Sequence, residues 1–440
     1  MIVNSKIHLR TGELRKKDAG KILKKLTFST PENQVVTCYR ITPEKIVLPR
    51  GAWSEIPSYV EYADRTSFPA MPELEFTKTL DDVEKDERFG GQRRAVKAMF
   101  ENEQGMIIRP PGTGKTQIAL AFVAACKTRS LVLVHTHDIL KQWHDYALEA
   151  IPGLSVGVIQ GSKSEVGHLT IATVQTLKNY IAGEGPEFWE QFGAVILDEA
   201  HHGPAKTFEL VLNSVPARYR FGFTASATRA DGMEPALRWL IGPTIHKKKF
   251  TSPVDLKVVP IKTKFNYKYR GRWDWGNLIR ALIVDPGRNR LIAKVVNREV
   301  ARGNSVLVLS RRIEHLEKIS EQLECKNEIL NASRGKRKRD DILGRFREGD
   351  IRCVLATQLA DEALDIPRLN RVCLVHPGKH EGRIIQQIGR ALREFPNKKN
   401  VRIYDFIDPK ISVLHRQWKK RKHTYRKLKI KVKLYKRKVA

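Results

Sequence analysis

The sequence has few cysteines, few acidic residues and no long hydrophobic run. Its cysteines are widely separated and form no C-x-x-C pair, which argues against a disulfide framework or a zinc site; they are Cys38, Cys126, Cys325, Cys353 and Cys373. The longest apolar runs have the length of single strands, so we expect no membrane span. Residues 1–10 have no apolar secretory core, and we therefore expect an intracellular, cytoplasmic protein.

Positive charge is the most distinctive feature of the composition. The 80 lysines and arginines against 48 acidic residues give a formal charge of +32 at pH 7. Solubility alone needs far less charge of one sign, so this excess predicts a polyanionic partner, most simply nucleic acid. The apolar fraction of 41% suffices for real cores, and 440 residues suit two or three domains.

A strand–loop–helix pattern near residue 110 has the residues of a phosphate-binding loop. The apolar run Met106–Ile108 leads into Arg109-Pro110-Pro111-Gly112-Thr113-Gly114-Lys115-Thr116, and an apolar helical pattern follows. In such a loop the glycines let consecutive N–H groups surround phosphate oxygens, the lysine reaches the β- and γ-phosphates, and the threonine holds Mg²⁺. Arg109 stands where the full pattern has its first glycine. The alternative is a glycine-rich turn ahead of a helix.

Two acidic residues follow another buried strand pattern. Ala194–Leu197 is entirely apolar and is followed at once by Asp198 and Glu199. In a nucleotide-hydrolysing site, such a pair supplies a Mg²⁺ ligand and a base that activates water. The alternative is an acidic helix start. Gln92, upstream of the loop, could bind the adenine edge or simply face solvent.

A second alternation of strands and helices begins near residue 289 and has no glycine-rich loop. It includes a predicted basic loop at 334–339, a strand pattern ending at Thr357, and the run Gln386 to Arg393. Arg390 and Arg393 are three residues apart and share one helical face. They could act as arginine fingers on a nucleotide held by the first pattern, or belong to a salt-bridged surface helix.

Two basic segments could bind nucleic acid directly. Trp273 and Trp275 lie among basic residues, which suits either a base-stacking surface or packed linker aromatics. Near the end of the chain, apolar residues alternate with lysines from Leu428 to Leu434, as in a strand with one lysine face. This stretch is interpreted as a phosphate-binding surface, with a disordered basic tail as the alternative.

Taken together, these motifs resemble those of superfamily 2 helicases, over roughly residues 92–408. The P-loop matches motif I, Asp198-Glu199-Ala200-His201 the DEAH form of motif II, and Ser226-Ala227-Thr228 motif III. Residues Ala356-Thr357 to Asp365-Ile366-Pro367 match motif V, and Gln386–Arg393 motif VI. The segments 140–143 and 224–232 are most similar to the XPB-like branch and the small phage branch-migration helicases.

The resemblance implies an α/β fold of two tandem RecA-like parallel-sheet lobes. We expect an N-terminal α+β accessory domain at 1–85, a first lobe at 86–245, a linker and second lobe at 246–412, and a basic C-terminal extension at 413–440. It also implies a monomeric ATP- and Mg²⁺-dependent enzyme that moves 3′→5′ on DNA, unwinding or branch-migrating it in replication, recombination or repair. The alternatives are an RNA helicase, the motor subunit of a restriction system, and a basic duplex-binding module with a degenerate ATPase core.

The expected roles of individual residues follow from these matches. Catalysis is assigned to Lys115, Asp198, Glu199, Gln386, Arg390 and Arg393. ATP binding is assigned to Gln92, Pro111, Gly112, Thr113, Gly114, Lys115, Thr116 and Asp365, with Thr116 and Asp198 holding Mg²⁺. Thr173, Gln175 and Thr357 are expected to contact the DNA backbone, which carries no sequence code.

Overall fold

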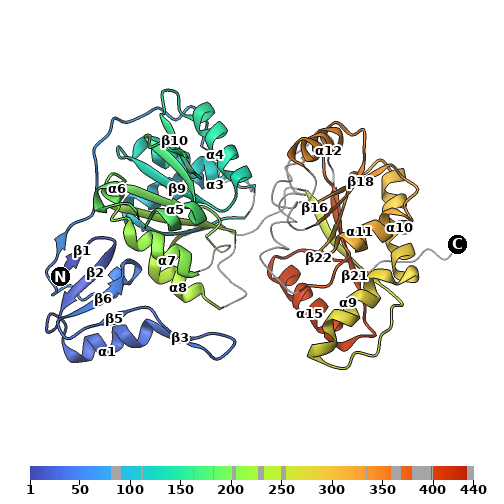
Figure 1. Ribbon diagram of the computed structural model, residues 1–440, viewed down its shortest axis with the longest axis horizontal. Coiled ribbons are helices and arrows are strands. Elements are labelled where there is room, and N and C mark those ends of the chain that lie inside the picture. The colour runs from blue at the N-terminus through green and yellow to red at the C-terminus, as the bar shows by residue number, and fades with distance from the viewer. Residues whose placement is uncertain are drawn as a thin grey trace. The chain divides into compact units, whose positions relative to one another are not determined.

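The computed structural model describes two compact units, Met1–Lys249 and Phe250–Ala440 (Figure 1). The described residues are 1–80, 91–110, 112–161, 163–181, 183–200, 205–225, 232–248, 254–331, 335–357, 368–378, 398 and 400–433. The predicted class is confirmed, because each unit contains a mainly parallel sheet and the first also carries a small mixed N-terminal sheet. None of the described helices is long and apolar enough to cross a membrane.

The N-terminal sheet has the order β5-β6-β2-β1-β7 and is covered by α1 (Lys16–Lys25). Its strands are β1 (Ile2–Val3), β2 (Lys6–Arg10), β5 (Arg40–Ile41), β6 (Lys45–Pro49) and β7 (Ala63–Asp64), with a separate hairpin of β3 (Thr27–Ser29) and β4 (Val35–Thr37). Buried Ile7, Leu9, Ile22 and Leu48 form its core. Alternate residues of β2 are buried, so one face of this sheet is covered.

The N-terminal sheet is fixed to the first lobe through a short 3₁₀ helix, η1 (Arg50–Glu55), which packs on α8 (Glu234–Ile241). The Arg50 guanidinium is buried and donates hydrogen bonds to the carbonyl oxygens of Ala217 and Arg218. Gly51 lies so close to the Trp239 carbonyl that a Cβ there would clash with the backbone. Residues 65–80 then run along the lobe, so this part of the predicted accessory domain contacts the lobe directly.

The first lobe contains an eight-stranded sheet of order β11-β10-β12-β9-β13-β14-β8-β15, parallel except for β11. Its central strands are buried on both faces, which explains their continuous apolar sequences. The strands are β8 (Gln104–Ile108), β9 (Ser130–Val134), β10 (Val156–Gln160), β11 (Lys163–Ser164), β12 (Leu169–Thr173), β13 (Ala194–Leu197), β14 (Tyr219–Thr224) and β15 (Thr244–Lys247). The helices are α2 (Gln92–Asn102), α3 (Lys115–Ala125), α4 (His137–Ala150), α5 (Val174–Tyr180), α6 (Pro186–Glu190), α7 (Ala205–Ser214) and α8.

The second unit contains a seven-stranded parallel sheet of order β18-β19-β17-β20-β21-β16-β22. Its strands are β16 (Asp255–Lys262), β17 (Val306–Ser310), β18 (Asn327–Leu330), β19 (Cys353–Thr357), β20 (Arg371–Leu374), β21 (Asn400–Ile407) and β22 (Lys431–Val432). Its helices are η2 (Arg272–Asp274), α9 (Trp275–Val284), α10 (Pro286–Ala301), α11 (Ile313–Ser320), α12 (Lys336–Glu348) and α15 (Ser412–Lys427).

Two basic segments of the second unit pack into its core, the first against the sequence prediction and the second in agreement with it. The predicted loop at 334–339 is wrong from residue 336 onward, because α12 begins at Lys336 and buries Ile342 and Phe346 in the core. In the C-terminal segment, α15 buries Trp418 and Tyr425 in the same core, and β22 pairs in parallel with β16. The described part of that segment, through residue 433, is therefore an integral part of the lobe.

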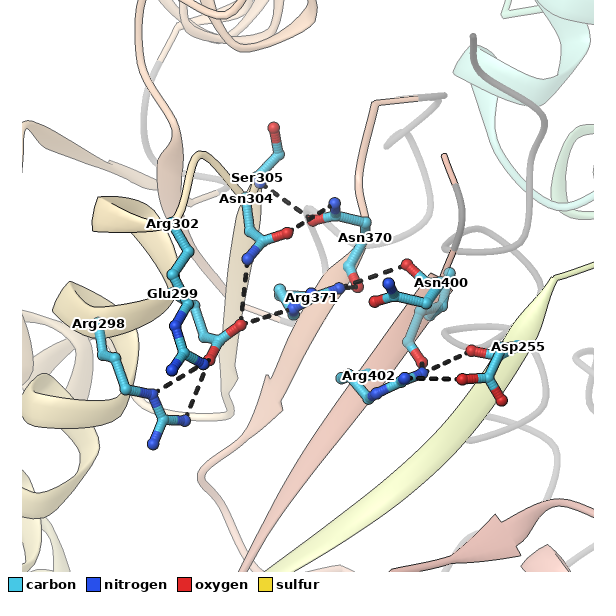
Figure 2. Close-up of polar contacts among 11 residues, drawn as sticks. Asp255, Arg298, Glu299, Arg302, Asn304, Ser305, Asn370, Arg371, Asn400 and Arg402 are labelled. Carbon is cyan, nitrogen blue, oxygen red and sulfur yellow. Dashed lines mark hydrogen bonds and ion pairs between the residues drawn. The ribbon is translucent and has the colours of Figure 1, made fainter. Parts of the chain in front are cut away.

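The amino ends of the central strands of the second sheet are held by a carboxylate-centred network (Figure 2). Glu299 is 1% exposed and accepts hydrogen bonds from Arg371 Nε at 2.7 Å, Asn304 Nδ2 at 3.1 Å and Arg298 Nη2 at 3.0 Å. These guanidinium groups keep the pKa of Glu299 below its usual value although burial acts to raise it. The positive charge at this edge is therefore largely paired, in a network that joins α10 to β20.

Candidate active site

The loop between β8 and α3 has the backbone of a phosphate-binding loop. Gly112 and Gly114 have φ values of 69° and 76°, in the region that favours glycine, and α3 begins at Lys115 directly after Gly114. A Cβ at Gly114 would lie 2.1 Å from Gln92 Nε2, so a side chain there would displace Gln92. The N-terminus of α3, which extends from residue 115 to 125, points its first N–H groups toward this loop, as anion binding requires.

Arg109 supports this loop from inside the protein. Its side chain is fully buried; Nη2 donates to the Thr113 carbonyl oxygen at 3.1 Å and Nη1 to that of Gly91 at 3.4 Å. Burial lowers the pKa of Arg109 to about 10, which still leaves the guanidinium charged near neutral pH. The residue that departs from the glycine pattern therefore holds the loop against the start of α2.

Arg109 also fixes the protonation of His246. Its Nη1 lies 3.1 Å from His246 Nε2, and a guanidinium can only donate, so Nε2 is the acceptor of a neutral ring. Burial, followed by the nearby charge of Arg109, lowers the pKa of His246 to about 4. A protonated ring would lose this hydrogen bond and repel the guanidinium.

His246 is expected to make the first unit acid-sensitive. Its pKa is about 4 when folded and 6.5 in the reference state, so the unfolded chain binds more protons between these values. Stability is therefore present above about pH 6.5 and falls as the pH drops toward about 4. His246→Gln should flatten the decline in Tm between about pH 7 and pH 5. Substitution of the exposed His137 should leave that decline unchanged, and an equal slope for both variants would contradict the assignment.

The acidic pair at the end of β13 lies beside the loop lysine. Lys115 Nζ is 2.5 Å from Glu199 Oε1, which joins residues that are 84 positions apart in the chain. Both side chains are largely buried, at 10% and 17% exposure. Glu199 has a φ of 46°, an uncommon conformation for a residue with a side chain, and such strain is concentrated at functional sites. Strands β8 and β13 are separated only by β14, so both motifs lie at the carboxyl edge of the sheet.

Two further residues hold the acidic pair, and the sequence patterns did not assign them to the site. Trp143 Nε1 donates to Asp198 Oδ2 at 2.8 Å, and His135 Nε2 lies 2.8 Å from the Glu199 carbonyl oxygen. Burial, and then the charge of Glu199, raises the pKa of Asp198, while Lys115 and the Trp143 hydrogen bond act to lower it. The sequence signal for His135 is its position at the end of the apolar run that forms β9. Trp143 lies in the segment 140–143 that resembles the XPB-like branch, but that resemblance gave it no role.

The other expected site residues fall into three groups. Gln92 is 1% exposed and donates to Gln117 Oε1 at 3.2 Å, beside the loop. Thr173 is buried and accepts from the Thr176 N–H as the N-cap of α5, Gln175 is exposed, and Thr357 is buried at the end of β19. Five expected residues lie outside the described residues: Pro111, Asp365, Gln386, Arg390 and Arg393.

Comparison with known proteins decides the family. The model of the type III restriction enzyme res subunit matches residues 85–229, and that of the helicase conserved C-terminal domain matches residues 287–394. The DNA 3′-5′ translocase XPB2 of Sulfurisphaera tokodaii is 24% identical over 348 residues, covering 69% of this chain and 78% of that protein. The chain has the two conserved domains of a superfamily 2 helicase and is similar to helicases of the XPB-like type. As such it is an ATP-dependent enzyme.

Another relative is named for RNA and not for DNA. A protein of Acanthamoeba polyphaga mimivirus, whose name assigns it to the ATP-dependent RNA helicases, is 27% identical over 363 residues, covering 78% of this chain and 67% of that protein. The structure of yeast Dbp5 bound to RNA and ADP BeF3 aligns with a TM-score of 0.57 at 14% identity, covering 78% of the helicase and 88% of Dbp5. That likeness concerns the fold.

Proposed function

We propose that the protein is a DNA helicase or translocase that moves 3′→5′, acting as a monomer in the cytoplasm. The Lys115–Glu199 ion pair, 2.5 Å long, is the observation that carries the proposal. It brings the lysine of the phosphate-binding loop into contact with the acid that follows the motif II strand. The two residues must lie this close together if one lobe is to hold the phosphates of ATP and activate water beside them.

The residues of the first lobe suit hydrolysis of a nucleotide. Phosphates held by the loop would draw Lys115 away from Glu199, and the released carboxylate would orient and deprotonate the attacking water. The buried carboxylate of Asp198 and the hydroxyl of Thr116, at the start of α3, suit a hard cation. These two residues would hold Mg²⁺, which neutralises charge on the phosphates. Gln92, beside the loop, would contact the adenine edge.

The second lobe would supply the remaining groups. From the motif matches alone, we propose that Arg390 and Arg393 act as arginine fingers. On the same basis, Gln386 takes part in catalysis and Asp365 binds the nucleotide. For DNA, the exposed Gln175 is the best placed of the three proposed contacts in the first and second lobes, because the Thr173 hydroxyl already caps α5. The net charge of +32 supports a polyanionic partner.

The choice between DNA and RNA can be tested by stimulation of ATP hydrolysis. We expect single-stranded DNA to raise the ATPase rate of the full-length protein well above that produced by RNA of equal length. The mimivirus relative is the reason to keep RNA as the second candidate. Stronger stimulation by RNA would replace the DNA proposal, and no stimulation by either would leave only a basic ATP-binding protein.

Trp143→Phe is expected to weaken the use of Mg²⁺ while leaving the fold intact. Phenylalanine can fill most of the buried volume but cannot donate the 2.8 Å hydrogen bond to Asp198. We expect about a tenfold lower kcat/KM for ATP and a higher Mg²⁺ requirement, as for other residues that orient a metal ligand. A Mg²⁺ titration of the ATPase at fixed ATP measures both. An unchanged titration curve would show that Trp143 serves only in packing.

A further inference from the structure

The segment that follows β16 exposes a row of cationic side chains. Between residues 262 and 270 exposure alternates along the chain: the odd-numbered side chains are buried or partly buried, and the even-numbered ones are exposed. The exposed members are Lys262, Lys264, Asn266, Lys268 and Arg270. The inward members, including Phe265 and Tyr269, pack on the cluster that contains Leu278 and Ile411. The apolar half of the segment thus holds the cationic half toward solvent.

The row ends at an exposed tryptophan on a fixed turn. Trp273, in η2, is 71% exposed, whereas Trp275, two residues later, packs on the cluster of Phe265. Asp274 between them is buried, and its carboxylate accepts from Tyr267 Oη and Asn277 Nδ2, both at 3.0 Å, and from the Arg270 N–H at 3.1 Å. The backbone under Trp273 is therefore anchored from three directions while its indole remains accessible.

The lysines of this segment differ in ion pairing from the cations at the amino ends of the strands. Within the described residues, no acidic side chain forms an ion pair with Lys262, Lys264 or Lys268, whereas Glu299 engages several cations at the amino ends of the strands (Figure 2). The segment follows the carboxyl end of β16. Because the strands are parallel, this is the same side of the sheet on which β19 ends with Thr357. Four strand spacings separate these two strands, about 19 Å in all.

We propose that residues 262–273 form a contact for single-stranded DNA, in which Trp273 stacks on a base and the cationic row binds phosphates. An exposed aromatic beside unpaired cations is the combination that binds single strands without reading their sequence. Duplex would not use the indole, because its bases are already stacked on one another. The inference rests on the proposed function, since it assigns part of the DNA path of that motor.

The stacking part is tested with Trp273→Ala in the full-length protein. We expect its affinity for a fluorescein-labelled oligo(dT) to fall about tenfold or more, with little change for blunt duplex, in an anisotropy titration without nucleotide. An oligonucleotide of abasic sites should bind wild type and Trp273→Ala equally, and Trp273→Phe should recover most of the affinity for oligo(dT). Tyr62→Ala, which removes an aromatic side chain that is 56% exposed in the first unit, is the matched control.

The cationic part is tested by the salt dependence of the same titration. The double variant Lys264→Ala/Lys268→Ala should lower the slope of log affinity against log salt by about 1.4, because each phosphate that is no longer neutralised reduces it by about 0.7. The pair Lys294→Ala/Lys326→Ala, two exposed lysines on α10 and just before β18, should leave the slope unchanged. An unchanged slope in the first double variant would remove the cationic row from the proposed surface.

Failure of this inference can be separated from failure of the proposed function. If wild-type ATPase is stimulated by DNA while Trp273→Ala binds oligo(dT) as tightly as wild type, the stacking contact is wrong and the motor assignment stands. An equal loss of affinity on oligo(dT) and on the abasic polymer would also overturn stacking. If DNA does not stimulate wild-type ATPase, the proposed function itself fails. Because Trp273 is so exposed, its variants are expected to melt at the wild-type temperature.

Discussion

Glu199→Gln is expected to reduce DNA-stimulated ATP turnover by about two to four orders of magnitude. The substitution preserves the size of the side chain but removes the base that we propose to activate water. It also removes the charge that pairs with Lys115 at 2.5 Å, so Lys115 becomes available to the phosphates of ATP. ATP affinity should therefore be equal to or higher than that of wild type. Steady-state hydrolysis and equilibrium nucleotide binding measure the two effects separately.

A matched control for this variant is Glu190→Gln, on the exposed end of α6 in the same lobe. It should hydrolyse ATP at the wild-type rate, because it changes the charge of the lobe equally without touching the site. Turnover by Glu199→Gln within tenfold of wild type would remove Glu199 from catalysis. Loss of nucleotide binding in that variant would indicate a role in shaping the loop instead.

Lys115→Ala is expected to abolish measurable ATP turnover and to weaken ATP binding as well. The lysine is the only proposed contact from a positively charged side chain of the first lobe to the β- and γ-phosphates. Its removal also takes the Lys115 charge away from Glu199, which is 17% exposed, so the site should become less favourable for an anionic ligand. The measurement is nucleotide binding together with hydrolysis, in the same preparation.

Lys97→Ala provides the comparison for this second variant, because Lys97 is 76% exposed and pairs only loosely with Glu101 at 3.6 Å. Its ATP binding and turnover should match those of wild type. Wild-type hydrolysis by Lys115→Ala would exclude the loop as the nucleotide site. Combined with Glu199→Gln, the two losses should be far from additive, since both residues act on the same phosphate and water.

Local sequence patterns were sufficient for the elements of the first lobe that form the proposed nucleotide site. The glycines of the loop, the apolar strand before it and the acidic pair after β13 are each recognisable within about ten residues. The parallel-sheet fold was also predictable, because continuous apolar runs such as 131–134 indicate strands buried on both faces. Gln92 was noted by its position upstream of the loop; its side chain lies beside Gly114, and its role toward adenine stays a prediction.

The supporting contacts were not predictable, because they join residues that are distant in the chain. Arg109 was noted only as a departure from a glycine, yet it contacts Gly91 and His246, which are 18 and 137 positions away. Trp143 was covered only by the resemblance of segment 140–143, without a role; it is buried and also binds Asp198, 55 positions away. The charge of 334–339 suggested a loop, whereas burial of Ile342 and Phe346 on the second sheet favours a helix that begins at Lys336.

The same limit applied to the two tryptophans of the basic segment. Both are tryptophans in the same basic segment, so the sequence left base stacking and packing in the linker as alternatives for each. The structure separates them: Trp275, at the start of α9, is partly buried against the cluster of Phe265, while the anchored turn exposes Trp273. Whether the odd- or the even-numbered residues of 262–270 face the core depends on the cluster around Leu278 and Ile411. That cluster joins segments more than 130 positions apart.

Strand displacement tests the central claim most directly, namely that ATP hydrolysis in the first lobe drives movement along DNA. The substrate is a partial duplex with a 3′ single-stranded tail, compared with the same duplex carrying a 5′ tail. The wild-type protein should displace the strand from the 3′-tailed substrate with Mg²⁺ and ATP, and Glu199→Gln should bind that substrate but not displace the strand. Displacement by Glu199→Gln at the wild-type rate, or equal displacement by wild type with a non-hydrolysable ATP analogue, would contradict the account.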